Sequence, residues 1–182
     1  RLFFNFKEEN PDKFYNCGIA EALMTGVAAG LANCGFSALT YTITPFNTLR
    51  CLEHIKLDVC YPNLPVTIVG TGSGLSYASL GTTHHSLDDV ASMRMLPNMQ
   101  VLAPGDTFEV ICCLNAAIES RKPTYIRLGK KNEPVVHKKT LSYFIGKVIP
   151  VFKGRKNLII GVGNMLSECV IAAKKYENEL NF

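Results

Sequence analysis

Apolar and polar positions follow a helical rhythm in some parts of the chain and a strand rhythm in others. The first clear helix begins at Glu21, and its larger apolar residues recur three or four positions apart: Leu23, Met24, Val27 and Leu31. A glycine directly after Cys34 predicts its end. Gly26 and Gly30 lie one turn apart, although a glycine inside a helix costs about 0.5–1 kcal/mol relative to alanine. We interpret the pair as a place where another backbone approaches closely.

β-rich segments alternate with helical segments over the following hundred residues. Strands are predicted over 36–43, 66–69, 99–102 and 124–128. Helices are predicted over 47–60, 86–95 and 107–119, and Asp106 is placed to cap the last of them. This alternation predicts an α/β fold, in which a parallel sheet is flanked by helices on both faces.

The C-terminal part of the chain predicts the start of a second α/β domain. Residues 129–156 are polar and basic, and we interpret them as a linker that carries one short strand. A strand over 158–162 and a helix over 165–180 follow. A single strand and helix cannot bury their own faces, so we expect this domain to be incomplete. The predicted division is 1–135 for the first domain and 136–182 for the linker and second domain.

Composition excludes several classes of protein. The chain has 182 residues, 47% of them hydrophobic, with 19 basic and 15 acidic residues that give a net charge of +4. No basic cluster argues for nucleic acid, and no apolar run is long enough to span a membrane. The seven cysteines form no C-x-x-C pair and show no metal-ligand spacing, which favours reduced thiols in a cytoplasmic compartment. Neither a signal peptide nor an initiating methionine is present, so the N-terminus looks processed.

Glu21 is the first candidate for chemistry. A carboxylate at a helix start can be a simple end charge, stabilised against the helix dipole by about 0.3–1 kcal/mol. Alternatively, the apolar neighbours Ile19 and Leu23 would bury Glu21 and raise its pKa, which is typical of a functional group. For most glutamates the first reading is the more frequent one, but these apolar surroundings favour the second for Glu21.

Two histidines and two cations are the other candidates. His84 and His85 follow a loop of small residues, where one imidazole can transfer protons or recognise a hydroxyl group. No third ligand lies nearby, so we expect no metal site there. Arg127 and Lys130 end a predicted strand, and cations at this edge of a parallel sheet can bind a phosphorylated substrate. Lys131 is equally consistent with a solvated charge.

Several of these segments, taken together and in order, resemble the pyrimidine-binding domain of the transketolase family. They are Cys17-Gly-Ile-Ala-Glu21 with its glycine-containing helix, Gly81-Thr-Thr-His-His85, Met95-Leu-Pro-Asn-Met-Gln-Val-Leu-Ala-Pro-Gly-Asp106 and Thr124-Tyr-Ile-Arg-Leu-Gly129. The resemblance covers about residues 10–130 and is strongest to the separate C-terminal chains of split transketolases. It implies that residues 136–182 are the linker and the first strand and helix of the transketolase C-terminal domain.

The resemblance implies an enzyme that uses thiamine diphosphate to transfer a two-carbon ketol unit between sugar phosphates. It implies that Glu21 hydrogen-bonds the aminopyrimidine ring of the cofactor and so promotes loss of the thiazolium proton. Phe46 is the candidate to stack on that ring, and His84 matches the family's substrate-facing histidine. The diphosphate and Mg²⁺ would be held by a partner domain or subunit, in a homodimer or a heterotetramer.

Three departures from the family's pattern affect the substrate. Thr82 stands where the family usually has proline, Leu80 where most full-length transketolases have aspartate, and Gly72 near a usual histidine. The resemblance therefore leaves the sugar open. A deoxyxylulose-phosphate synthase-like enzyme is one alternative, and a non-catalytic transketolase-like partner subunit is another.

Overall fold

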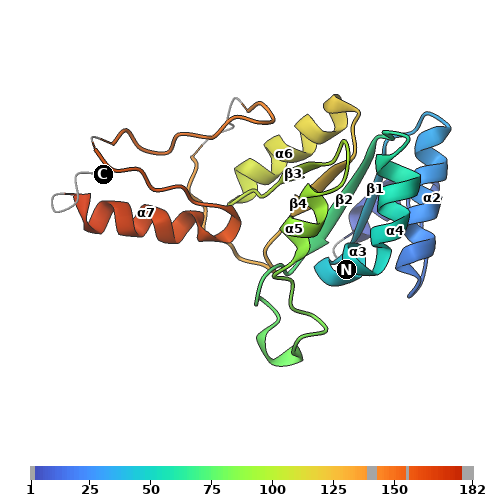
Figure 1. Cartoon of the computed structure of the whole chain (residues 1–182), viewed down its shortest axis with the longest axis horizontal. Coiled ribbons are helices and arrows are strands. Elements are labelled where there is room, and N and C mark those ends of the chain that lie inside the picture. Colours follow the sequence, from blue (N-terminus) through green and yellow to red (C-terminus); the bar gives the residue numbers. More distant parts are fainter. Residues whose placement is uncertain (1–2, 139–142, 155, 178–182) are drawn as a thin grey trace.

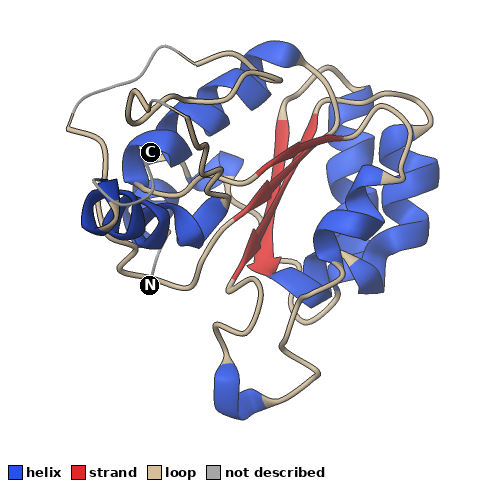
Figure 2. Cartoon of the chain, turned by 60° about the vertical axis from the view of Figure 1, so that its left-hand side comes forward, coloured by secondary structure: helices blue, strands red, loops and turns tan. Residues whose placement is uncertain are grey.

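A parallel sheet lies at the centre of the computed structural model, which describes residues 3–138, 143–154 and 156–177. Within these residues, the strand order is β1-β2-β4-β3, and all three pairings are parallel. The strands are β1 (Ala38–Ile43), β2 (Val66–Thr71), β3 (Gln100–Leu102) and β4 (Thr124–Arg127). Figure 2 shows the sheet between helices, which confirms the predicted α/β architecture.

One face of the sheet is covered by α2 (Glu21–Asn33), by the segment after β1 and by α5 (Asp89–Arg94). The segment after β1, predicted as one helix over 47–60, is broken into α3 (Thr44–Asn47), η2 (Leu49–Cys51), α4 (Leu52–His54) and the π-helical η3 (Ile55–Cys60). The break falls at Thr48, whose backbone is not helical, with φ −116° and ψ −83°. Val66, Ile68 and Tyr125 lie in the core on this face.

The opposite face is packed by α6 (Thr107–Ser120), whose Cys113 and Ala117 meet Val69 and Ile126 of the sheet. Core residues of one strand thus alternate between the two faces, as the two-residue period of a strand requires. Asp106 caps α6 as predicted, because its side chain accepts a hydrogen bond of 2.9 Å from the N–H of Glu109.

The small side chains of α2, not its large ones, face the sheet. Thr25, Ala28, Ala29 and Ala32 are buried, whereas Leu23 and Val27 are 60% and 39% exposed. Small residues let the helix approach the strands closely, and the larger apolar side chains are left on the outer surface. Gly26 and Gly30 are also open, since a Cβ atom at either position would meet nothing within 4 Å. The close approach predicted from this glycine pair is therefore not made among the described residues.

The chain ends are organised differently from the prediction. α1 (Phe4–Glu9) and η1 (Pro11–Lys13) precede α2 and were not predicted. The helix predicted over 165–180 is present as η5 (Gly163–Met165) and α7 (Leu166–Lys175), which extend away from the sheet in Figure 1. Residues 178–180 of that prediction lie outside the described residues.

The strand predicted over 158–162 is wrong, because these residues have no regular structure. Leu158 and Ile160 are 81% and 67% exposed. A strand requires a neighbouring strand to accept its hydrogen bonds, and no other described segment pairs with this one. The described part of 129–156 contains no strand either, while residues 139–142 and 155 lie outside the described residues.

Candidate active site

The sequence-predicted site residues come from four segments that meet at one edge of the sheet. β1, β2 and β4 run parallel, so the residues that follow them, at Phe46, in the loop 72–86 and at Lys130, leave the sheet at its carboxyl edge. α2 precedes β1 and packs on it. Because the chain reverses between α2 and β1, the first residue of α2, Glu21, lies at this same edge.

Glu21 is buried, with 8% of its surface exposed, as the sequence predicted. The predicted neighbours do not bury it, however, because Ile19 and Leu23 are 96% and 60% exposed. Its carboxylate instead forms an ion pair with Arg50, with 2.7 Å between Oε2 and Nη1. The thiol of Cys51 is close by, and its pKa is raised mainly by burial and further by the charge of Glu21.

Phe46 and Arg50 are positioned by a hydrogen-bonded turn after β1. Asn47 is fully buried and donates a 2.9 Å hydrogen bond to the carbonyl of Val69 in β2. The Thr48 hydroxyl donates to the carbonyl of Thr44, at 2.7 Å. These bonds fix the turn against the sheet, and the Arg50 guanidinium then lies over the Phe46 ring, 4.3 Å from its centroid.

His84 belongs to the same group of side chains. Its ring meets Phe46 edge-on at 5.2 Å between centroids and meets Tyr77 in a similar way at 5.8 Å. The Thr83 hydroxyl is 2.9 Å from His84 Nδ1, so His84 is oriented by its own loop. Arg50 thus links the Glu21 carboxylate to the Phe46 ring, and the Phe46 ring in turn contacts His84.

Sequence reasoning missed Tyr77, Arg50 and the reason for Gly72. Gly72 has φ +72°, and a Cβ there would lie 1.9 Å from Tyr77 Cε2. Only glycine therefore leaves room for the Tyr77 ring in this position. The sequence did contain a signal for this contact: Gly72 lies near the position of a larger residue of the family, and the aromatic Tyr77 follows five positions later. Arg50 gave no comparable signal, because it is 29 residues away from the glutamate with which it pairs.

The remaining candidates have different surroundings. His85 Nε2 is 2.9 Å from the carbonyl of Ala78, within its own loop. Lys130 is exposed, and its ammonium lies 4.6 Å from the centroid of the Tyr77 ring. Arg127 is mostly buried and forms an ion pair of 2.8 Å with Asp89, which also accepts the Tyr125 hydroxyl at 2.7 Å. Lys130 is thus available to a ligand, whereas Arg127 already has a buried carboxylate partner.

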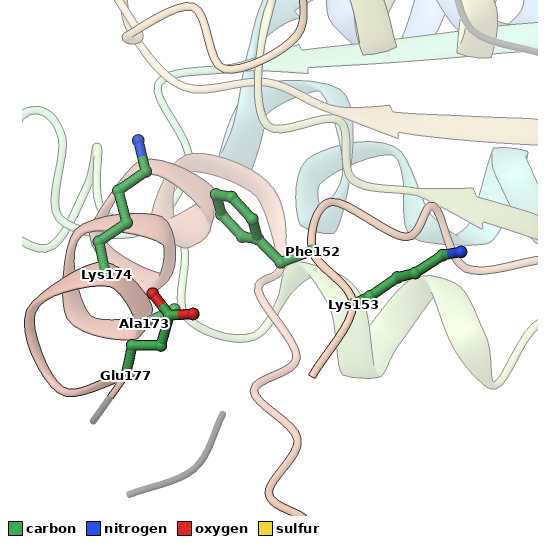
Figure 3. Close-up of a pocket in the computed structure, with 5 residues that line it drawn as sticks. All are labelled: Phe152, Lys153, Ala173, Lys174 and Glu177. Atoms are coloured by element: carbon green, nitrogen blue, oxygen red, sulfur yellow. The ribbon is translucent and has the colours of Figure 1, made fainter. Parts of the chain in front are cut away.

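A second feature of the described chain lies away from these candidate residues. A small cavity of about 70 Å³ lies beside α7 and is shown in Figure 3. Lys174 covers Phe152 there, with 5.7 Å between Nζ and the ring centroid, and none of the candidate residues lines it. The described residues contain no group of three or more potential metal ligands, and no described helix is long and apolar enough to cross a membrane.

Comparison with known proteins gives a consistent result. The family model of the transketolase pyrimidine binding domain matches residues 3–135. The chain is 40% identical to one subunit of the apulose-4-phosphate transketolase of Actinobacillus succinogenes, over 93% of this chain and 55% of the relative. It is 34% identical to the 1-deoxy-D-xylulose-5-phosphate synthase of Clostridium perfringens, over 97% of this chain and 28% of that enzyme.

The structure also resembles a solved one. A split gene transketolase, described as an inactive beta4 tetramer, superposes with a TM-score of 0.88 at 35% identity, over 96% of this chain and 56% of the other. The chain therefore spans about half the length of the separate transketolase chains that it matches.

Proposed function

Because the chain belongs to the transketolase pyrimidine-binding domain family, we propose that it supplies the pyrimidine half of a thiamine diphosphate-dependent transketolase. The proposed reaction transfers a two-carbon ketol unit between sugar phosphates. The observation that carries the proposal is the meeting of the buried Glu21 carboxylate, the Phe46 ring and the His84 imidazole at the carboxyl edge of the sheet.

The side chains fit a planar ring that carries hydrogen-bond donors. The Arg50 guanidinium is itself planar and rich in N–H groups, and it contacts both the Glu21 carboxylate and the Phe46 ring. A planar group with N–H donors is thus compatible with the space between the Glu21 carboxylate and the Phe46 ring. An aminopyrimidine ring requires the same two contacts, a carboxyl group at its edge and an aromatic ring on its face.

Each residue then has a distinct role. When bound, thiamine diphosphate supplies carbanion chemistry at its thiazolium carbon. Glu21 would hydrogen-bond the ring nitrogen of the aminopyrimidine and hold the proton that sets its tautomer. Phe46 would fix the plane of the ring, and His84 would donate to or accept from substrate hydroxyls. Lys130 is the candidate for the substrate phosphate, because its ammonium is exposed at this edge.

Arg127 and His85 were predicted as substrate contacts, and their surroundings favour supporting roles. Arg127 joins β4 to α5 through Asp89, and it approaches the loop 72–86 through the carbonyl of Ser86. His85 closes its own loop on Ala78. Both would act by holding the loop that presents His84.

A partner must complete this site. We propose that a diphosphate-binding transketolase domain or subunit holds the diphosphate and Mg²⁺, in a homodimer or heterotetramer. Support comes from an exposed apolar surface, formed by Leu23 and Val27 of α2 and by Ile19 just before the helix, beside the open Gly26 and Gly30. All seven cysteines lie in the described part of the chain as thiols, and four of them are buried, which supports a reducing compartment such as the cytoplasm.

We also propose that residues 1–135 form the pyrimidine-binding domain and that 136–182 begin a second domain. The two parts contact each other along α6, where Val136 and His137 donate to Asp106, and Tyr143 and Ile145 pack on the core beside the helix. The N–H of Gly163 also donates a 3.1 Å hydrogen bond to the carbonyl of Ala103. Leu166 packs closely on Gly105, since a Cβ atom added to Gly105 would lie 2.6 Å from the Cβ atom of Leu166.

Two alternatives have some support. The relative from Clostridium perfringens favours a deoxyxylulose-phosphate synthase-like reaction, in which a 2-oxoacid that loses CO₂ would supply the two-carbon unit that is joined to the sugar phosphate. Leu80 and Gly72, which replace polar residues of the family's pattern, favour a non-catalytic partner subunit. Incubation of the assembled enzyme with a ketose phosphate, or with pyruvate, distinguishes the two enzymes by product, and the absence of cofactor binding would favour the non-catalytic role.

Exchange of the thiazolium proton tests the proposed role of Glu21. In the enzyme reconstituted with its diphosphate-binding partner, Glu21→Gln should keep the fold but slow this exchange by at least roughly a hundredfold, because one carboxyl contact sets the tautomer. Glu53→Gln is the matched control, since Glu53 is an exposed glutamate on the neighbouring α4. Proton exchange can be followed by NMR after quenching in acid, and a wild-type rate in Glu21→Gln would refute the assignment.

A further inference from the structure

Arg50 makes both of the contacts that the proposed function assigns to the cofactor ring. Its Nη1 atom donates to Glu21 Oε2 at 2.7 Å, and its guanidinium lies over the Phe46 ring at 4.3 Å. We propose that Arg50 is a placeholder: it occupies the aminopyrimidine position in the cofactor-free chain and must move out when the cofactor binds. This inference rests on the proposed function of Glu21 and Phe46.

The match is one of shape and of chemistry. A guanidinium is flat, so it can lie on an aromatic face, and its N–H groups form a fork that suits a carboxylate. An aminopyrimidine is also flat and also presents N–H groups at its edge. A lysine ammonium would pair with Glu21 but would not form a flat layer on Phe46. The geometry therefore points to direct competition between Arg50 and the ring for one place.

Arg50 is free to leave, whereas Glu21 is not. The Arg50 side chain is 47% exposed, and that of Glu21 is 10% exposed. Arg50 lies in η2, a single short turn that follows the break at Thr48, so its side chain can rotate toward solvent without unwinding a long helix. The acceptors that it leaves behind stay fixed, since Glu21 is the first residue of the packed helix α2.

The contact also compensates the buried charge of Glu21. A buried carboxylate without a partner is destabilising, and Arg50 neutralises Glu21 until a ligand takes its place. The consequence is a lower apparent affinity for the cofactor, because the competent state is only a fraction of the population. If one molecule in ten is open, which corresponds to about 1.4 kcal/mol, the apparent Kd is raised tenfold.

Binding measurements on the complete enzyme, assembled with its diphosphate-binding partner, test the proposal. Arg50→Met keeps an unbranched, flexible side chain, although a shorter one, and removes the guanidinium. Titration calorimetry with thiamine diphosphate and Mg²⁺ should give a Kd roughly tenfold lower for Arg50→Met than for the wild type, with faster loading in stopped-flow experiments. Without cofactor, the Arg50→Met enzyme should have a lower melting temperature than the wild type. The cofactor should raise the melting temperature of Arg50→Met by more than it raises that of the wild type. Lys56→Met is the matched control, because Lys56 is an exposed cation on the same segment.

A second variant separates charge from shape. Arg50→Lys retains the cation that neutralises Glu21 but loses the planar guanidinium over the Phe46 ring. The Kd of this variant for the cofactor should therefore lie between those of the wild type and Arg50→Met. Equal Kd values for the wild type and Arg50→Met, or weaker binding by Arg50→Met, would overturn the placeholder while leaving the proposed function intact. A wild-type enzyme that binds no thiamine diphosphate contradicts the proposed function itself.

Discussion

His84 and His85 are consecutive in the chain, but their imidazole rings have different partners. His84 lies against Phe46 and Tyr77 at the carboxyl edge of the sheet, whereas His85 contacts the carbonyl of Ala78 in its own loop. Neighbouring side chains of a turn diverge, so only one of them can be directed at a ligand beside Phe46. We assign that role to His84 and a supporting role to His85.

The two histidines should therefore differ in kinetics. His84→Ala should lower kcat/KM for a ketose phosphate donor by roughly ten- to a hundredfold, the effect of losing one hydrogen bond of about 1.5–3 kcal/mol to a charged or polarised group. His85→Ala should have a smaller effect on kcat/KM, and neither variant should greatly change the Kd of the cofactor. Steady-state kinetics and calorimetry of both variants check this, and equal losses would mean that the whole loop acts only as a scaffold.

At the residue scale, the sequence predicted the burial of a side chain better than it predicted the contacts of that side chain. The burial of Glu21 was predicted correctly, but its neighbours were not, because Ile19 and Leu23 face outward. Local spacing cannot show that Arg50 folds back on Glu21. That contact depends on the break at Thr48, where a tertiary hydrogen bond network overrides the helical spacing of residues 47–60.

At the scale of elements, the start of α6 joins two parts of the chain. Asp106 accepts hydrogen bonds from the N–H of Glu109 at 2.9 Å and, from the segment after β4, from the N–H groups of Val136 and His137 at 3.0 and 2.8 Å. Glu109 in turn accepts a 2.7 Å hydrogen bond from the N–H of Gly105, the residue before the N-cap, in a variant of the capping box. Burial alone would raise the pKa of Asp106, but these donors together hold it below its ordinary value.

This cap should make stability depend on pH. Because the folded-state pKa of Asp106 is lowered, its contribution is complete above the unfolded pKa of about 4 and is lost as the pH falls toward the folded value. Asp106→Asn should lower the free energy of unfolding at pH 7 by about 1–3 kcal/mol, since the charged acceptor is lost. Urea unfolding at pH 7 and at about pH 3 should show that this difference shrinks in acid.

Asp88 provides the control for that experiment. It precedes α5 as Asp106 precedes α6, but its side chain makes no capping hydrogen bond. Asp88→Asn should therefore have little effect on the free energy of unfolding at either pH, and a pH dependence equal to that of Asp106→Asn would contradict the explanation.

The sequence did predict the Asp106 cap, because a cap and its helix are adjacent in the chain. It failed for residues 158–162, where a β-rich pattern has no strand beside it.

At the scale of the whole molecule, α2 has one face on the sheet and an apolar face in the open. Leu23 and Val27 are exposed there, with Ile19 exposed just before the helix, beside two glycines at which a Cβ would meet no atom within 4 Å. A helix surface with small residues and flanking apolar side chains is suited to close packing against another helix. The close approach that the glycine pair predicts is not made among the described residues, and the partner interface proposed above would supply it.

Two substitutions at Gly26 should separate association from folding. Gly26→Leu should weaken association with the diphosphate-binding partner at least roughly tenfold, because a bulky side chain prevents close packing. Gly26→Ala should instead stabilise the unassembled chain by about 0.5–1 kcal/mol, since a Cβ there meets no atom and alanine favours a helix. Analytical ultracentrifugation and circular dichroism measure the two effects, and unaltered association of Gly26→Leu would place the interface elsewhere.

The strand order has a consequence for the chain while the ribosome is still making it. β2 pairs with β1 on one side and with β4 on the other, although β3 and α6 come between β2 and β4 in the sequence. At about 5–20 residues per second, synthesis from Thr71 to Arg127 takes roughly 3 to 11 seconds. During that interval one side of β2 has no hydrogen-bonding partner, and Val69 has no α6 to cover it. The nascent protein thus exposes its central strand until nearly all of residues 1–135 have been translated. During this interval the unpaired strand edge is most prone to aggregation, and binding by a chaperone would be most useful.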